Sequence, residues 1–380
     1  MRIESQETMK IVQASLNERQ PEDSDQSVVF RGDGEPKTPR NTLRKLTEFE
    51  AEVGLESDTF SMGGTVEKLE KKFAEMLGKE RAIFMPTGTL ANHLATRKLC
   101  GTRPRAIVQE QSHLYNDTGD CVPRLSGISL IPLGQGRPGF TLDELRDEVG
   151  RSKTGRVETS VGAVMIESPV RRQAGQVVPY NQMEDISSFC RDRSIPVHLD
   201  GARLYMMSAA TGVSPQRYAA LFDTVYVSLY KYFGAPFGAV LAGTEAFIDG
   251  LYHERRMFGG GLVSAYLPAA LALNGTEGFE QRFAAAMEKA AELFHRLNSL
   301  EGVSVGCFEH GSNIFPLVLA SGIDGERVTA KLKEHWVFLY PDEAVPARIL
   351  LTVNTTLLRQ TNDELFTAFE EALNLSRVSG

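Results

Sequence analysis

The chain has 380 residues, of which 42% are hydrophobic and 24% are charged, and its net charge at pH 7 is −8. This composition is ordinary for a folded globular protein, and the length allows two domains or one large domain with a smaller partner. Acidic and basic residues are interspersed without a basic cluster, so we expect no nucleic-acid partner.

The sequence also limits the location of the protein. No apolar run approaches the roughly 18 residues of a membrane-spanning helix, so we expect no membrane association. The four cysteines are widely spaced and form no CxxC pair, which predicts reduced thiols, a cytoplasmic location and no metal site. Residues 1–27 are polar and lack the apolar core of a signal peptide, so we expect a polar N-terminal extension.

From about residue 65 the chain alternates short apolar strands with helices. The strands are continuously apolar, as buried parallel strands are, and are expected at 82–85, 106–109, 128–133, 162–167, 195–200, 224–229 and 238–243. Helical periodicity follows at 65–79, 141–149 and 181–193. This pattern predicts an α/β fold, with a large domain at 28–285 built on a mostly parallel seven-stranded sheet. Residues 286–380 are expected to form a smaller α+β domain.

Four segments place chemically useful side chains after predicted strands, where open α/β sheets bind ligands. The stretch MPTGTLANH (85–93) brings Thr87, Gly88 and Thr89 to a helix start, which suits a phosphate, although a capped turn is the simpler alternative. Lys231 follows a buried strand, where desolvation would favour its neutral, nucleophilic form, unless it reaches out to solvent.

Asp200 and Arg203 in IPVHLDGARLY (195–205) follow another strand, as site residues, as a structural ion pair, or as a helix-capping aspartate followed by a surface arginine. His113, after a fourth strand, could present its ring to a flat ligand or be purely structural. The stretch GQGRPG (134–139) matches a dinucleotide-binding pattern, but the helix after it has its own cap at Thr141, so we interpret the glycines as a loop.

Together these residues suggest one cofactor, pyridoxal 5′-phosphate. Its chemistry needs a lysine that bonds to the cofactor aldehyde, a carboxylate that keeps the pyridine nitrogen protonated, and an anion site. Lys231, Asp200 and the helix start at Gly88 supply these three functions.

The sequence resembles the threonine aldolase/β-eliminating lyase family, of fold type I among pyridoxal phosphate enzymes. Four motifs in this order carry the resemblance: PTGTLAN (86–92), HLDGAR (198–203), YKYFGAPFG (230–238) and MFGGG (257–261). The resemblance covers residues 28–275 well and the C-terminal domain weakly.

The resemblance implies a role for each matching residue. Lys231, His113 and Asp200 are the expected catalytic residues, and Lys231, Asp200, His113, Thr87, Gly88, Thr89 and Arg203 are expected to bind the cofactor. Substrate binding is expected at Arg203, Arg348 and Arg171. Arg203 would hold the substrate carboxylate, and Arg348 matches a second carboxylate-binding arginine.

Several motifs depart from the family pattern around the expected substrate. FRSDT reads FRGDG, so Gly32 replaces a serine; YGEDPT reads FSMGGT; GGGMRQ reads GGGLVS; and the histidine after the small-domain arginine is absent. ENTHN reads ESPVRRQAG (167–175), where Arg171 could replace a lost anion contact or accept an acidic substrate side chain. The simpler alternative is a surface arginine that pairs with Glu167 or with the other subunit.

The resemblance therefore implies a lyase that cleaves a β-hydroxy-α-amino acid such as threonine or allo-threonine into glycine and an aldehyde, with His113 or a water as base. The alternatives are β-elimination, racemisation or transamination of another amino acid, a cofactor-binding scaffold without turnover, or a dinucleotide-dependent dehydrogenase. The resemblance also implies a homodimer or homotetramer with its sites at the subunit interface, and residues 257–273 are either part of that interface or a core helix.

Overall fold

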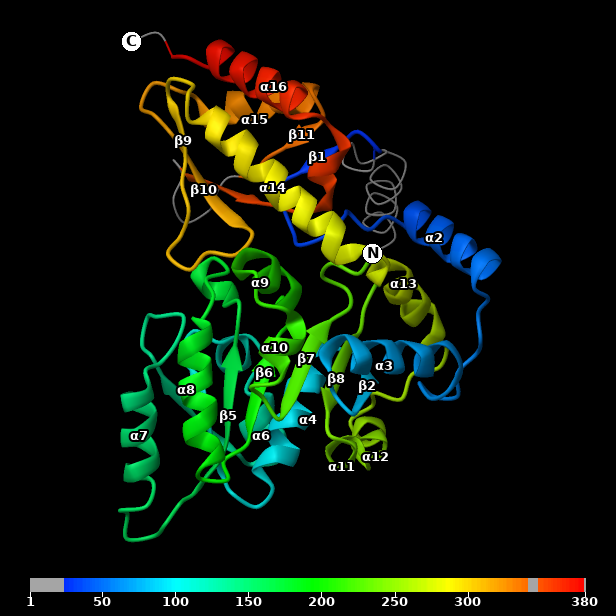
Figure 1. Ribbon diagram of the computed structural model, residues 1–380, viewed down its shortest axis with the longest axis vertical. Helices are drawn as coiled ribbons and strands as arrows, with labels where there is room; N and C mark the ends of the chain where they lie inside the picture. The colour runs from blue at the N-terminus through cyan, green and yellow to red at the C-terminus, as the bar shows by residue number, and fades with distance from the viewer. Residues whose placement is uncertain (1–23, 341–347, 379–380) are drawn as a thin grey trace, which may run out of the picture.

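A computed structural model describes residues 24–340 and 348–378, so most of the predicted N-terminal extension lies outside the described residues (Figure 1). The main sheet has the strand order β2-β8-β7-β6-β5-β3-β4. Its strands are β2 (Arg81–Met85), β3 (Arg105–Gln109), β4 (Ser129–Leu133), β5 (Val161–Glu167), β6 (Val197–Asp200), β7 (Thr224–Ser228) and β8 (Ala239–Gly243). All seven predicted strands are therefore present.

The sheet is parallel except for one strand. β4, β3, β5, β6 and β7 pair in parallel, and β8 runs antiparallel to both of its neighbours, β7 and β2. The parallel register aligns Glu167 with Asp200 and Asp200 with Tyr226. Glu167 and Asp200 therefore lie side by side at the carboxyl ends of β5 and β6, next to Tyr226 in the middle of β7. This topology confirms the predicted mostly parallel α/β fold.

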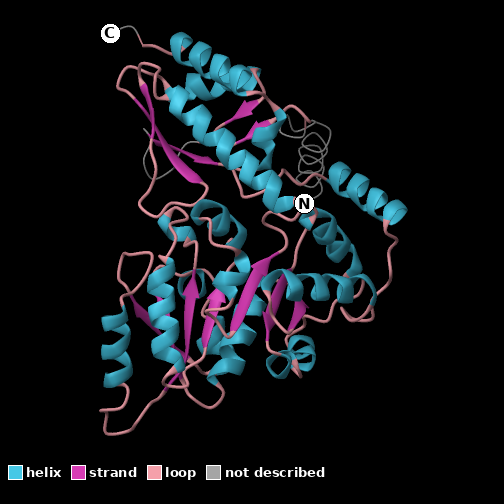
Figure 2. Cartoon of the chain, viewed as in Figure 1, coloured by secondary structure: helices cyan, strands magenta, loops and turns pink. Residues whose placement is uncertain are grey.

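Alternate strand residues face opposite sides of the sheet, and each side has its own apolar core. In β2, for example, Phe84 packs in one cluster and Ile83 and Met85 in another. Helices that contribute to the Phe84 side are α3 (Gly64–Leu77), α7 (Leu142–Arg151), α8 (Tyr180–Arg191), α9 (Leu204–Thr211), α10 (Pro215–Ala219) and α13 (Tyr266–Thr276). Those on the other side are α4 (Gly88–Cys100), α5 (His113–Asn116), α6 (Cys121–Ser126), α11 (Glu245–Ile248) and α12 (Leu251–Met257). Figure 2 shows the strands enclosed between helices.

A second apolar core lies above the main sheet in Figure 1 and belongs mostly to the C-terminal part of the chain. Its antiparallel sheet has the order β12-β10-β9, and a separate pair joins β1 to β11 in parallel. The strands are β1 (Val28–Val29), β9 (Val303–Val305), β10 (Ile314–Leu319), β11 (Val337–Phe338) and β12 (Arg348–Thr352). The helical elements are α15 (Gly325–Glu334), η3 (Thr355–Arg359) and α16 (Asn362–Leu375).

Two segments connect the cores. The helix α14 (Phe279–Leu297) buries Phe279 and Phe283 in the main core and Leu293 in the second core. The N-terminal segment contributes Val28, in β1, and Phe30, just after it, to the second core. From the sequence, residue 28 was predicted to begin the large domain. The domain limits 28–285 and 286–380 stay a prediction. α2 (Pro39–Glu52) lies against α13, which itself is mostly buried. Within residues 24–340 and 348–378, no helix is long and apolar enough to cross a membrane.

Candidate active site

A cavity of about 570 Å³ opens at the carboxyl ends of the central strands. This volume lies within the usual range for small-molecule sites, about 300–1,000 Å³. All but one of the predicted site residues line it: Thr87, Gly88, Thr89, His113, Arg171, Asp200, Arg203 and Lys231. Glu167, Tyr226, Tyr230 and Phe237 are among the other lining residues. The fold thus brings together side chains that are spread over about 150 residues of sequence.

The first wall of the cavity is the start of α4. Thr87 caps this helix, because its hydroxyl accepts a hydrogen bond from the Leu90 N–H at 3.1 Å. The N–H groups of Gly88 and Thr89 are at the first two helical positions, where no preceding carbonyl can accept from them. Gly88 is required by packing, because a Cβ there would lie 2.0 Å from the Tyr226 hydroxyl oxygen. The resulting helix start can bind an anion.

The second wall is Asp200, whose carboxylate is held by two donors. Oδ1 accepts from the Ala202 N–H at 3.1 Å, and Oδ2 accepts from Asn92 Nδ2 at 2.5 Å. The chain can turn tightly after Asp200 because Gly201 has no side chain; a Cβ there would lie 2.9 Å from the Tyr226 carbonyl oxygen.

Behind Asp200 lies a buried hydrogen-bond chain that sequence reasoning missed. Asn92 Oδ1 lies 2.9 Å from His198 Nε2, and His198 Nδ1 lies 2.8 Å from the Thr224 hydroxyl. Complete burial lowers the pKa of His198 to about 4, so the ring is neutral, with its proton on Nε2 facing the amide oxygen. Asn92 is one helical turn after Gly88, and this spacing was the available signal that both face the site.

Two oppositely charged groups in the cavity have strongly shifted pKa values. Burial, followed by the charge of Arg203, lowers the pKa of Lys231 to about 8. Burial, followed by the charge of Asp200, raises the pKa of Glu167 to about 7. Such shifts are typical of functional sites, because they bring proton transfer into the neutral range. Glu167 did not appear among the predicted site residues.

Glu167 also holds two neighbouring segments in place. Its Oε2 accepts from the His113 N–H at the start of α5, and its Oε1 accepts from the Arg171 N–H at 2.9 Å, at the start of η2 (Arg171–Gln173). The Gln109 side chain in turn fixes Glu167, since its amide accepts from the Glu167 N–H and donates to the Glu167 carbonyl, each at 2.7 Å. One carboxylate therefore sets the backbone positions of two cavity residues.

Asp117 lies at the cavity rim, close to two arginines and a histidine. Its carboxylate lies 2.9 Å from Arg172, 3.4 Å from His113 Nδ1 and 4.0 Å from Arg171. The contact with His113 favours the tautomer with its proton on Nδ1, which leaves Nε2 as an acceptor. The alternative pairing of the Arg171 side chain with Glu167 does not occur, because only its backbone N–H contacts that carboxylate.

Arg203 lies deeper in the cavity and is held by Asp33 of the FRGDG segment. Its Nε donates to Asp33 Oδ2 at 2.7 Å. Burial alone would lower the pKa of Arg203, but the charge and hydrogen bond of Asp33 raise it. Gly34 packs on the backbone of Lys231, where a Cβ would lie 2.9 Å from the carbonyl oxygen. Arg203 is therefore a fixed cation at this site.

Arg348 is the one predicted site residue that does not line the cavity. It is the first residue of β12, in the smaller antiparallel sheet, where it lies opposite Val318 of β10. Residues 341–347, which precede it, lie outside the described part of the chain. Its role in substrate binding stays a prediction.

The glycine-rich stretch 134–139 does not form a dinucleotide site. It is a loop in which Gly134 and Gly136 have positive φ, and α7 begins beyond it with its own capping box of Thr141 and Glu144. The side chains of Thr141 and Glu144 therefore cap the start of α7, as predicted, and the glycines form a separate loop.

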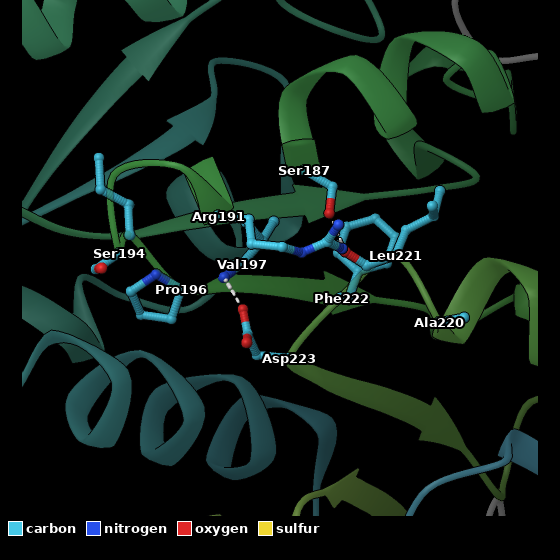
Figure 3. Close-up of a pocket in the computed structure, with 10 residues that line it drawn as sticks. Ser187, Arg191, Ser194, Pro196, Val197, Ala220, Leu221, Phe222 and Asp223 are labelled. Atoms are coloured by element: carbon cyan, nitrogen blue, oxygen red, sulfur yellow. Dashed lines mark hydrogen bonds between the residues drawn. The ribbon is translucent and has the colours of Figure 1, made fainter. Parts of the chain in front are cut away.

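A second cavity, of about 350 Å³, lies at the opposite ends of β6 and β7 (Figure 3). Its polar groups mostly bond the backbone. Asp223 accepts from the Val197 N–H at 2.7 Å, and the Ser187 hydroxyl donates to the Leu221 carbonyl (Figure 3). We therefore regard the cavity of about 570 Å³ at the carboxyl ends of the strands as the candidate active site.

Comparisons with known proteins agree on one group of relatives. The family described as beta-eliminating lyase matches residues 37–314. A low-specificity L-threonine aldolase of Candida albicans is 30% identical over 272 residues, which cover 71% of this chain and 68% of that protein. A low-specificity L-threonine aldolase 1 of Arabidopsis thaliana is 24% identical, with 91% and 96% covered.

Among solved structures, one from Listeria monocytogenes, provisionally assigned as an L-allo-threonine aldolase, has a TM-score of 0.74 and 28% identity to this chain. The match covers 92% of this chain and 97% of that one. The family match over residues 37–314 includes every residue that lines the candidate active site.

Proposed function

Because the chain belongs to the threonine aldolase/β-eliminating lyase family, we propose that it is a pyridoxal 5′-phosphate-dependent carbon–carbon lyase. Its substrate would be a β-hydroxy-α-amino acid of the threonine or allo-threonine type, cleaved between Cα and Cβ to glycine and an aldehyde. The observation that carries this proposal is the convergence of Lys231, Asp200, His113 and the α4 start on one cavity.

The donor set fits pyridoxal phosphate. The N–H groups of Gly88 and Thr89, with Thr87, would hold the phosphate, and His113 would face the ring. Lys231, with its lowered pKa, has the nucleophilic amine that the cofactor aldehyde requires. When bound, the cofactor supplies a pyridinium ring that withdraws the electron pair released at Cα.

Asp200 is suited to hold a proton on the ring nitrogen. Two donors, Ala202 N–H and Asn92 Nδ2, stabilise its carboxylate form. The neutral His198 behind Asn92 fixes the amide orientation, so that Asn92 presents its N–H to Asp200. This chain of contacts is a positioning device for Asp200 and does not itself touch the cofactor.

Arg203 and His113 would each contact a different group of the substrate. Arg203, fixed by Asp33, would bind the α-carboxylate. His113, with Nδ1 on Asp117, has Nε2 available to accept the proton of the β-hydroxyl group. Loss of that proton lets the β-oxygen form a carbonyl while the Cα–Cβ bond breaks.

The test is a product assay on the purified protein loaded with pyridoxal phosphate. With L-threonine and L-allo-threonine we expect equal amounts of glycine and acetaldehyde. Lys231→Ala should lose both the cofactor's visible absorbance and the activity. Pyruvate and ammonia from serine or cysteine, without glycine, would replace the proposal by β-elimination.

We also propose that the protein works in the cytoplasm as a homodimer or homotetramer with its sites at the subunit interface. In support, the exposed apolar residues Phe60 and Met62 lie beside the exposed Met257 and Val263, and Ser61 Oγ contacts the Leu262 carbonyl at 3.1 Å. Met257→Glu combined with Val263→Glu should lower the mass measured by light scattering to that of one chain. An unchanged mass would place the interface elsewhere.

A further inference from the structure

The rim of the active-site cavity carries an arginine that the proposed reaction does not use. Arg171 lines the cavity together with Lys231, and its side chain is 61% exposed. Its backbone is fixed, because its N–H donates to Glu167 at 2.9 Å. The side chain is thus a solvent-accessible cation on a fixed backbone at the mouth of the site.

The neighbouring carboxylate does not neutralise Arg171. Asp117 forms a hydrogen-bonded ion pair with Arg172 at 2.9 Å, whereas Arg171 is at 4.0 Å, beyond hydrogen-bond distance. Two arginines share this one acidic partner, and Arg172 holds it more closely. One positive charge therefore remains in excess at the rim, and it belongs to the arginine that lines the cavity.

The cavity thus has two cations suited to carboxylates. Arg203 lies deep in the cavity beside Lys231, with its Nε on Asp33. Arg171 lies at the rim, on the side where His113 and Asp117 meet. A ligand that spans the cavity from Arg203 to Arg171 would present an α-carboxylate at one end and a second anion at the other.

We propose that the preferred substrates are β-hydroxy-α-amino acids with an anionic side chain, of which 3-hydroxyaspartate is the smallest, and that Arg171 binds the side-chain carboxylate. This inference rests on the proposed function. In the reaction the β-hydroxyl proton passes to a base and the Cα–Cβ bond breaks. The β-carbon leaves as glyoxylate, and the electron pair on Cα takes up a proton to give glycine.

The first test measures binding, so that it does not depend on turnover. L-Aspartate and L-asparagine have nearly the same shape, differ in side-chain charge and lack the β-hydroxyl group. Calorimetry on the cofactor-loaded protein should give a dissociation constant about tenfold lower for aspartate, as a charge-assisted contact would. Arg171→Gln should reduce that ratio to about one, whereas Arg171→Lys should keep part of it.

Arg172→Gln is the comparison variant, because Arg172 is the neighbouring arginine and does not line the cavity. Since it frees Asp117 to pair with Arg171, the aspartate-to-asparagine ratio should fall below that of the unsubstituted protein but stay above that of Arg171→Gln. Both glutamine variants keep the backbone N–H that Glu167 accepts, and circular dichroism would verify their folding. If Arg171→Gln weakened both ligands equally, Arg171 would bind the α-carboxylate and the inference would be wrong. A ratio of one in the unsubstituted protein would also overturn it.

A second test measures cleavage. The ratio of kcat/KM for 3-hydroxyaspartate to that for threonine should fall about tenfold in Arg171→Gln, with the loss mainly in KM, because the contact is made with the bound substrate. Threonine cleavage without any preference for 3-hydroxyaspartate would overturn the inference and leave the proposed function intact. Discrimination in binding without cleavage of either compound would overturn the proposed function and leave the anion site intact.

Discussion

Cavities lie at both ends of strands β6 and β7, but the buried polar side chains at the two ends have different partners. At the amino ends, Asp223 bonds the Val197 N–H, and the Lys79 amine donates to the Phe222 carbonyl at 2.6 Å. At the carboxyl ends, Glu167 and Lys231 are buried beside other charges, and their pKa values are shifted toward the neutral range. Polar residues at one end complete the fold, whereas those at the other remain available for chemistry. A cavity alone therefore does not identify the site.

The largest effect should come from Lys231. Lys231→Ala removes the amine that lines the cavity floor and should lower kcat/KM by about 10³-fold or more. Lys79→Ala, at the opposite end of the sheet, is the matched control and should change kcat/KM less than about threefold. Initial rates of glycine formation would check both, and comparable losses would erase the contrast between the two ends.

A pair of aspartates sharpens the comparison further. Asp200→Asn keeps the side-chain shape but removes the charge that we propose to face the ring nitrogen, so kcat should fall by about 10²- to 10³-fold. Asp223→Asn at the amino end replaces only an acceptor for the Val197 N–H and should cost about 1 kcal/mol of stability with kcat preserved. Steady-state kinetics and urea unfolding of both variants would separate these outcomes.

Three buried groups should contribute to the pH dependence of stability: burial raises the pKa of Glu167 and of Glu70 to about 7 and lowers that of His198 to about 4. The folded-state pKa of Glu167 is about 7 against an ordinary 4.5, so between these values the folded chain binds more protons than the unfolded chain. The contribution of Glu167 to stability is therefore lost as the pH rises from about 4.5 to 7, by on the order of 3 kcal/mol. Glu70 acts in the same direction, whereas His198 makes stability rise with pH between about 4 and 6.5. For Lys231 the lowered pKa has its effect at higher pH, between about 8 and 10.5, where stability rises with pH.

Urea unfolding of the cofactor-free protein at several pH values would measure the Glu167 effect. Glu167→Gln should remove only the Glu167 contribution, so between pH 4.5 and 7 the stability of the variant should fall less, or rise more, with pH than that of the unsubstituted protein. This holds even though the amide is a poorer acceptor for the two N–H groups. An unchanged slope in the variant would assign the titration to another group.

The smallest expected effect concerns a glycine. Gly88→Ala places a Cβ 2.0 Å from the Tyr226 oxygen, and the resulting displacement should cost about 1–3 kcal/mol. Gly150→Ala in α7 is the matched control, because its Cβ would meet nothing within 4 Å, and it should stabilise the protein by about 0.5–1 kcal/mol. Thermal unfolding followed by circular dichroism would check both signs.

The sequence was sufficient for those parts of the fold that local patterns determine. Continuous apolar runs located all seven strands, and Lys231 and Asp200 were found because each follows such a run. The parallel register then brings the strand ends together without further information. Thr87, Gly88, Thr89 and His113 were likewise found after predicted strands, whereas Glu167 was not among the predicted residues.

Contacts between distant segments could not be predicted in this way. The pairing of Asn92 with His198 joins side chains from α4 and β6, and no local pattern encodes it. The raised pKa of Glu167 depends on burial beside Asp200, which only the assembled sheet creates. Strand β1 is two residues long, too short for a periodic signal, so its pairing with β11 was not anticipated.

The FRGDG segment has a consequence for the order in which the site is completed. Asn354 binds the Val29 and Gly32 carbonyls across more than 320 residues of sequence, and Asp33 lies in the segment that these bonds hold. During synthesis the segment emerges early, yet its anchor is made only when almost the whole chain exists. Arg203 therefore acquires its fixed partner as a late event of biogenesis. A chain truncated after residue 300 should fold its main sheet and still leave this arginine unanchored, which a lowered affinity for the substrate carboxylate would reveal.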